Sequence, residues 1–236
     1  MSRNFVLIHG AWHGGWCWQR VVELLERGGH RPFAPTLAGL ADRAHLAGGP
    51  IGLKTHIDDV VRIIEDEALE DIVLVGHSYG GFVISGVAER VLSSIESIIF
   101  LDAFFPGNGQ SLIDMGSRAG RDAVMAALEK GEEAVEPFSA AFFRVNEADQ
   151  AWVDRMCTPH PIKTFVDPIS LSGKREQIAN KVYIRAVDYP SVPFDNALIQ
   201  LRSDPAWRIY EIKCGHDAMI DMPERLTEIL IESASR

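Results

Sequence analysis

The stretch Val73-Leu-Val-Gly-His-Ser-Tyr-Gly-Gly-Phe82, VLVGHSYGGF, leads from an apolar run into a group of glycines with one serine among them. The apolar run predicts a buried strand, and the apolar spacing over 79–90 predicts a helix. G-x-S-x-G between a strand and a helix is typical of a nucleophile elbow, a sharp turn that exposes its serine at the end of a sheet. Ser78 is therefore predicted to be a nucleophile. An ordinary strand–helix turn that carries a serine is the alternative.

Outside this stretch, short apolar runs alternate with segments of helical apolar spacing. We expect strands at 5–8, 31–34, 72–75, 95–101, 181–186 and 207–212, and helices at 16–27, 55–67, 79–90, 195–202 and 223–231. This alternation predicts an α/β fold, with a mostly parallel sheet and helices on both of its faces.

One long segment, 107–173, interrupts the alternation. It shows little strand patterning, and a helix is expected at 121–130. An insertion of this length at the end of a strand favours a small helical cap over an unstructured loop. We therefore expect a single domain, with a core made of 1–106 and 174–236 and a helical cap made of 107–173.

Composition narrows the class of protein. With 236 residues, 47% of them hydrophobic, the chain can bury one sizeable core. A net charge of −10 without a basic cluster argues against nucleic acid or an anionic membrane as partner. Three scattered cysteines do not suggest disulfides, and no apolar run reaches the length of a membrane span or signal peptide. These features favour a cytoplasmic protein, and they leave a homodimer open.

A serine nucleophile needs a base, and in this motif the acid and then the histidine follow the elbow in the chain. His216 comes directly after the last expected strand, at the end of the sheet where Ser78 is placed, and it is the predicted base. His160 lies in the expected cap. His9 and His77 are expected to be structural, and a surface location is expected for His13, His30, His45 and His56.

Two aspartates compete for the role of the acid. Asp102 ends the apolar strand SIIFLD, where an unpaired carboxylate would be costly to bury, and it is favoured for that reason. Asp188 follows the strand VYIRA in a proline-rich loop and is the alternative. Asp195 and Asp217 are weaker candidates.

An oxyanion hole requires two N–H donors. The residue after the nucleophile, Tyr79, supplies one, and the loop after the first strand, where Gly10 allows close approach, supplies the second from Ala11. Four aromatic residues, together with parts of the expected cap, are candidates for lining a pocket for an apolar or aromatic substrate: Trp12, Trp16, Phe104 and Phe105.

The segments FVLIHGAWHGGWCW, THIDDV, VLVGHSYGG and the GH before the last helix resemble the α/β-hydrolase family of plant methylesterases and hydroxynitrile lyases. They are closer still to its small bacterial esterases, among which one cleaves the carbamate ester of carbendazim. This resemblance implies an α/β-hydrolase fold with a helical cap and a serine hydrolase without a cofactor. It assigns the nucleophile, base and oxyanion donors to Ser78, His216, Tyr79 and Ala11.

The sequence departs from parts of this family. The plant members have alanine at the position of Asp102 and take their acid from the loop of Asp188, whereas the bacterial relatives resemble this chain at LDAFFP. The lyases carry threonine at the position of Gly10 and lysine at that of Asp217, which argues against lyase activity.

The predicted function is hydrolysis of a small ester through an acyl-enzyme, with no cofactor and no metal. A non-catalytic receptor and a cofactor-free oxygenase on the same fold remain alternatives. Nucleotide binding is disfavoured because no phosphate-binding loop is present and the G-x-G at Gly107 lacks its third glycine. Cys157 and His160 have ligand-like spacing but no second pair of ligands.

Overall fold

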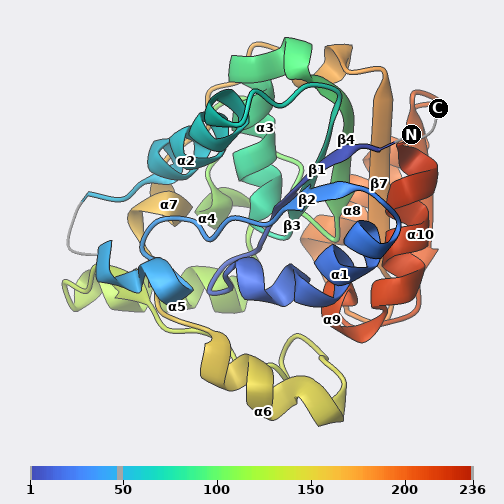
Figure 1. Cartoon of the computed structure of the whole chain (residues 1–236). Helices are drawn as coiled ribbons and strands as arrows, with labels where there is room; N and C mark the ends of the chain where they lie inside the picture. Colours follow the sequence, from blue (N-terminus) through green and yellow to red (C-terminus); the bar gives the residue numbers. More distant parts are fainter. Residues whose placement is uncertain (1, 47–49, 235–236) are drawn as a thin grey trace.

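The computed structural model describes residues 2–46 and 50–234 of the chain. A single six-stranded sheet lies at its centre, in the order β2-β1-β3-β4-β7-β8 (Figure 1). Its strands are β1 (Asn4–Ile8), β2 (Arg31–Phe33), β3 (Ile72–His77), β4 (Ile95–Leu101), β7 (Asn180–Ala186) and β8 (Trp207–Ile212). Every neighbouring pair is parallel, and each strand overlaps a predicted one.

Helices cover both faces of this sheet. Successive side chains of a strand point to opposite faces, so each apolar strand presents apolar side chains to the helices on both sides. Phe5 and Leu7 of β1 pack in the apolar cluster of α1 (Gln19–Arg27), α9 (Ala218–Asp221) and α10 (Pro223–Ser233). Val6 and Ile8 face the cluster of α2 (Leu53–Asp66), α3 (Gly80–Val91) and α8 (Val192–Arg202). Short 3₁₀ turns span Gly15–Trp18, Ala41–Leu46, Leu92–Ser94 and Arg175–Gln177. The predicted α/β fold is therefore confirmed.

The segment between β4 and β7 carries further elements. These are α4 (Leu112–Met115), α5 (Arg118–Glu129), β5 (Ala134–Val135), α6 (Glu147–Met156), β6 (His160–Pro161) and α7 (Lys163–Val166). The expected helix at 121–130 corresponds to α5, and β5 pairs with β6 in an antiparallel ribbon. In Figure 1, α6 lies apart from the sheet and the large helices.

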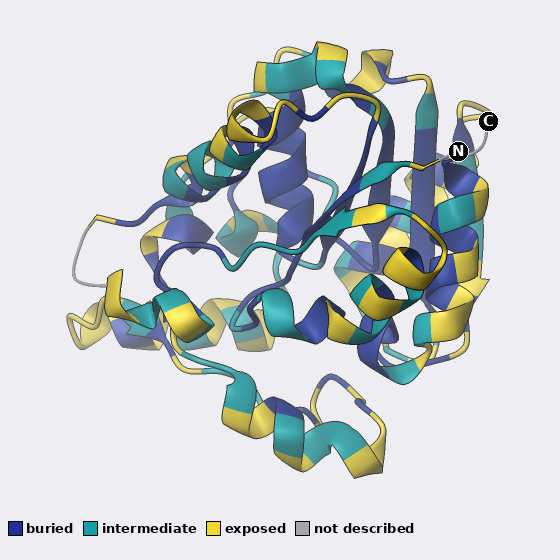
Figure 2. Ribbon diagram, in the orientation of Figure 1, coloured by how far each residue is buried: buried dark blue, intermediate teal, exposed yellow. Residues whose placement is uncertain are grey.

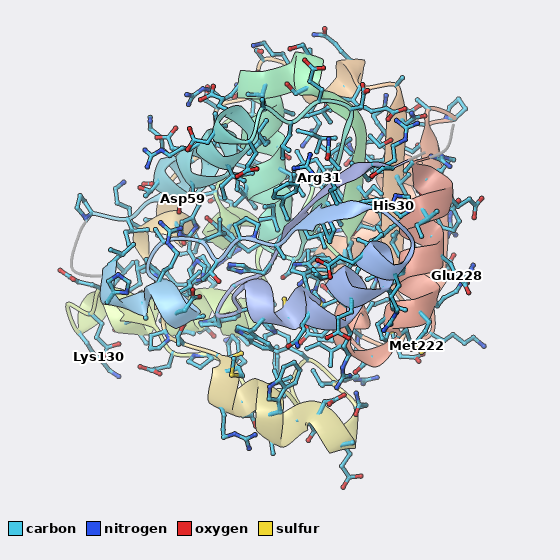
Figure 3. The ribbon with its side chains drawn as sticks, in the orientation of Figure 1. His30, Arg31, Asp59, Lys130, Met222 and Glu228 are labelled. Atoms are coloured by element: carbon cyan, nitrogen blue, oxygen red, sulfur yellow. The ribbon has the colours of Figure 1, made fainter. Side chains whose placement is uncertain are left out.

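Burial follows this layered arrangement. Figure 2 shows buried strands at the centre and exposed positions on the outer sides of the helices. Charged side chains such as Lys130 and Glu228 extend from the periphery (Figure 3). Within 2–46 and 50–234, no helix combines the length and apolar character that a membrane crossing needs.

Candidate active site

Ser78 occupies the turn between β3 and α3, at the carboxyl end of the sheet. Its backbone has a φ of 53°, a left-handed conformation that costs energy for a residue other than glycine. The turn is tied down because Ser78 N–H donates to Leu101 O at 3.2 Å, and Phe104 N–H donates to Ser78 O at 3.2 Å. A Cβ on Gly76 would lie 2.7 Å from Gly80 O, so the elbow requires glycine there. Ser78 thus sits at a strained, well-supported position on the rim of a pocket.

His216 contacts the carboxylate of Asp102, across 114 residues of sequence. His216 Nδ1 lies 2.6 Å from Asp102 Oδ2, and both side chains are buried. Because a carboxylate accepts, Nδ1 donates, and Nε2 is left as the acceptor nitrogen of the neutral ring. Asp188 is exposed, and among the described residues its carboxylate makes no hydrogen bond. Of the two candidate acids, only Asp102 is therefore in contact with His216.

Arg185 holds the other oxygen of this carboxylate. Its Nη1 donates to Asp102 Oδ1 at 2.7 Å, and its Nε donates to Asp195 Oδ1 at 2.9 Å. Burial opposes the guanidinium charge, but the carboxylates of Asp102 and Asp195 outweigh it and raise the pKa of Arg185. The sequence reasoning missed this residue, although an arginine within the apolar strand VYIRA was a signal that a buried partner exists.

The main chain of His216 is also fixed. Its N–H donates to Phe143 O at 2.9 Å, and its carbonyl accepts from His77 Nε2 at 3.1 Å. The imidazole stacks against the ring of Phe194, with centroids 5.3 Å apart and planes 13° apart. The elbow residue His77 and the inserted segment therefore both position the loop of His216.

The loop after β1 contains Ala11, whose N–H is one of the two predicted oxyanion donors. His9 Nδ1 donates to Gly10 O at 2.8 Å, and His9 Nε2 accepts from Leu37 N–H at 3.0 Å, which defines a neutral ring. Burial lowers the pKa of His9 to about 3, in agreement with this neutral state. Because Gly10 O is held, the peptide that carries Ala11 N–H has a defined orientation.

The next peptide is held at both ends. Ala11 O is bonded by His13 Nδ1 at 2.8 Å, and Trp12 N–H donates to His160 Nδ1 at 3.1 Å. Within the described chain, the N–H groups of Ala11 and Tyr79 have no acceptor, and both residues line the pocket with Ser78. This arrangement provides two N–H donors beside one hydroxyl.

The pocket has a volume of about 80 Å³ and contains Ser78 and His216 in its wall. Of the four aromatic candidates from the sequence, Trp12 and Phe104 line this pocket, whereas Trp16 and Phe105 do not. Trp16 stacks on His13 and contacts Trp152, and Phe105 packs against Phe100 and Trp207. The structure therefore places two of the four candidates at this pocket, because aromatic residues that are close in the sequence point to different surroundings.

Further aromatic residues line the pocket. They are Phe138, Phe142, Phe143, Phe165, Tyr189 and Phe194. Four of them belong to the inserted segment, and two follow β7. Their convergence was not readable from the sequence because it depends on how the insertion folds back over the sheet.

The expected surface location is wrong for two histidines. His13 is 2% exposed, and His56 is 0% exposed with its Nδ1 2.9 Å from the Tyr79 hydroxyl and its Nε2 2.9 Å from Ala38 O. Burial lowers the pKa of His56 to about 4. By contrast, His45 is exposed, and His30 is half-buried against the ring of Phe5 near the start of β2 (Figure 3).

Among the described residues, one group of His, Cys, Asp and Glu side chains is close enough to hold a metal ion: His77, His216 and Asp217. His77 Nε2 and His216 Nδ1 are already engaged in hydrogen bonds. The Cys157 and His160 pair is not such a group, since both ring nitrogens of His160 bond other residues. We therefore assign no metal role to either set.

Comparison with known proteins agrees with this architecture. Residues 5–229 match the model of the alpha/beta hydrolase family. The carbendazim hydrolyzing esterase of Nocardioides sp. (strain SG-4G) is 42% identical over 236 residues, which cover 96% of this chain and 98% of that protein. The putative chloroplastic methylesterase 11 of Arabidopsis thaliana is 28% identical over 252 residues, or 99% of this chain and 64% of that protein.

A solved structure shows the same fold. An extracellular alpha/beta-hydrolase from a Paenibacillus species superposes with a TM-score of 0.84 at 24% identity, covering 99% of this chain and 100% of that one. The family match and the relative at 42% identity both extend over nearly all of the sequence. The chain therefore belongs to the alpha/beta hydrolase family and is related over nearly its whole length to esterases.

Proposed function

We propose that this protein is a serine hydrolase that cleaves a small carboxylic or carbamate ester through an acyl-enzyme. The observation that carries the proposal is the buried contact of 2.6 Å between His216 Nδ1 and Asp102 Oδ2, at a pocket that also contains Ser78. A hydroxyl (Ser78), an acid (Asp102) and a base (His216) in this order along the chain match the pattern of the nucleophile elbow.

In the proposed mechanism, His216 Nε2 takes the proton of Ser78 as its oxygen attacks the ester carbonyl. The N–H groups of Ala11 and Tyr79 stabilise the oxyanion, and Asp102 stabilises the imidazolium that forms. His216 then protonates the leaving alcohol. Water, deprotonated by His216, cleaves the acyl-enzyme by the same route and restores Ser78. These steps require no cofactor.

The pocket supports an apolar or aromatic substrate of limited size. Its wall is largely aromatic, and its volume of about 80 Å³ suits a small acyl or carbamoyl group. A wider cavity of about 560 Å³ shares Phe142, Tyr189 and Pro193 with it and offers room for a larger leaving group. The relative at 42% identity is named for hydrolysis of carbendazim, and we extend carbamate esters to this chain on that basis.

The test is hydrolysis of a short-chain p-nitrophenyl ester by the wild type and Ser78→Ala, with mass spectrometry after exposure to a fluorophosphonate probe. We expect turnover and labelling in the wild type and neither in Ser78→Ala. Labelling without turnover would support the nucleophile but exclude the test ester as substrate. A wild type that shows neither would contradict the proposal and favour a non-catalytic receptor.

A further inference from the structure

A second buried ionisable pair lies directly behind the proposed catalytic residues. His13 Nε2 is 3.0 Å from Asp217 Oδ2, and the two side chains are 2% and 0% exposed. His13 belongs to the loop of Ala11, and Asp217 follows His216 in the chain. The mechanism proposed above uses neither side chain. Burying ionised groups is costly in free energy unless they are paired, so the pairing of these two needs an explanation.

The hydrogen bonds of His13 define its protonation state. Its Nδ1 lies 2.8 Å from Ala11 O, and a backbone carbonyl can only accept. Its Nε2 faces the carboxylate of Asp217, which accepts when it is ionised. A ring that donates from both nitrogens is an imidazolium. The ring also stacks on Trp16, with centroids 5.2 Å apart and planes 20° apart, a contact that favours a cation.

The charges of the surroundings agree with an ionised pair. Burial opposes the charge of His13, but the neighbouring Asp217 outweighs it and raises the pKa of the imidazole. Burial likewise opposes the carboxylate, yet His13, His77 and His216 together hold the pKa of Asp217 below its ordinary value. His77 Nε2 is 3.7 Å from Asp217 Oδ1 but donates to His216 O, so it is a weaker partner.

This pair connects the two loops on which catalysis would depend. On one side, His13 holds the carbonyl of Ala11, a residue that lines the pocket and carries a proposed oxyanion donor. On the other side, Asp217 is joined by one peptide bond to His216 and directly precedes α9, where its carbonyl accepts from Ile220 N–H at 2.8 Å. A shift of either loop would change the distance between the oxyanion donor and the base.

We propose that His13 and Asp217 are positioning residues, an imidazolium–carboxylate pair that fixes the oxyanion loop against the loop of the catalytic histidine. This inference rests on the proposed function, because it concerns the placement of Ala11 N–H and His216. It predicts that loss of the charge pair lowers kcat more than it changes KM, because the oxyanion donor is aligned for the transition state.

The decisive variant is Asp217→Asn, which preserves the shape of the side chain and can still bond a neutral imidazole. We expect kcat on a p-nitrophenyl ester to fall roughly 10- to 100-fold, as for a misplacement on the order of 1 Å, with little change in KM. Fluorophosphonate labelling of Ser78 should persist. Asp149→Asn is the matched control, because it also removes an ion pair, with Arg20 at 2.6 Å, outside these loops.

A second measurement determines the protonation state of His13 independently of enzyme activity. In ¹⁵N NMR of the histidine rings, with His13 assigned by its loss in His13→Gln, we expect both nitrogens of His13 to be protonated in the wild type. In Asp217→Asn we expect one protonated and one unprotonated nitrogen. Should Asp217→Asn not fold, His13→Gln tests the same kinetic effect, since its amide reaches only one of the two acceptors.

A neutral His13 in the wild type would overturn the inference, and so would an Asp217→Asn or His13→Gln enzyme with the kcat of the wild type. These outcomes differ from failure of the proposed function. In that case the wild type itself would show neither turnover nor labelling, whatever the NMR spectrum of His13.

Discussion

Arg185 and His216 bind opposite oxygens of the same buried carboxylate: Arg185 Nη1 lies 2.7 Å from Asp102 Oδ1, and His216 Nδ1 lies 2.6 Å from Asp102 Oδ2. The arginine stabilises the ionised carboxylate at a position that is 0% exposed. Its positive charge also partly compensates the negative charge of Asp102, so the carboxylate stabilises an imidazolium on His216 less strongly. Asp195, on the far side of Arg185, partly balances the guanidinium. Three residues, Arg185, His216 and Asp195, therefore act on the charge of the proposed acid.

The first prediction separates the two candidate acids. Asp102→Asn should lower kcat by about 10³- to 10⁴-fold, because the amide cannot hold the ring of His216 in the required tautomer. Asp188→Asn should retain the wild-type kcat, because the Asp188 side chain is exposed and lies outside the hydrogen bonds of His216. Steady-state kinetics of both variants checks this. A large loss of kcat in Asp188→Asn with a normal Asp102→Asn would reverse the assignment.

The second prediction concerns Arg185. Arg185→Met leaves Asp102 buried without its cation and should cost about 3–5 kcal/mol in the free energy of unfolding, measured with urea. Asp195→Asn should cost less than about 1 kcal/mol, because the Asp195 side chain is 53% exposed.

Arg185→Lys, which keeps the charge, serves as the reference if Arg185→Met does not fold. A loss of stability in Arg185→Met no greater than that in Asp195→Asn would contradict the prediction.

The third prediction is a loss of stability in mild acid. Burial lowers the pKa of His9 to about 3 and that of His56 to about 4, from an ordinary value of 6.5. Below 6.5 the unfolded chain therefore binds protons that the folded chain does not. The stability is fully present above that pH and falls as the pH drops toward the folded values, by up to about 1.4 kcal/mol per pH unit for each histidine.

Urea unfolding of the wild type, His56→Gln and His45→Gln at about pH 7 and about pH 5 measures this effect. His56→Gln should lose less stability between the two conditions than the wild type, although it starts from a lower value because it loses a buried ring. His45 is exposed, so His45→Gln should follow the wild type. If His56→Gln and the wild type lost the same free energy of unfolding between the two pH values, the prediction would be contradicted.

The sequence alone determined the order and type of the sheet elements. Apolar runs such as VLVG and SIIFL are typical of a strand buried on both faces. Gly76 is required by the close contact of β3 with α3, and Gly80 by that of α3 with the end of β1. These are local properties of the chain. For the same reason Ser78 could be placed at the end of a strand, and His216 beyond the last one, without knowledge of the fold.

Only the tertiary structure decided which side chains meet. Asp102 and Asp188 both follow strands that end at the same edge of the sheet, and the contact with His216 distinguishes them. His13 and Asp217 acquire their roles from partners far away in the chain, so no local pattern indicates them. The place of Arg185 in an apolar strand indicates that it has a buried partner, but not that this partner is Asp102. Trp12 and Trp16 lie four positions apart in the sequence, yet of the two only Trp12 lines the pocket. Such contacts depend on long-range packing, because a buried charge or aromatic ring is stable only beside the particular groups that the fold brings to it.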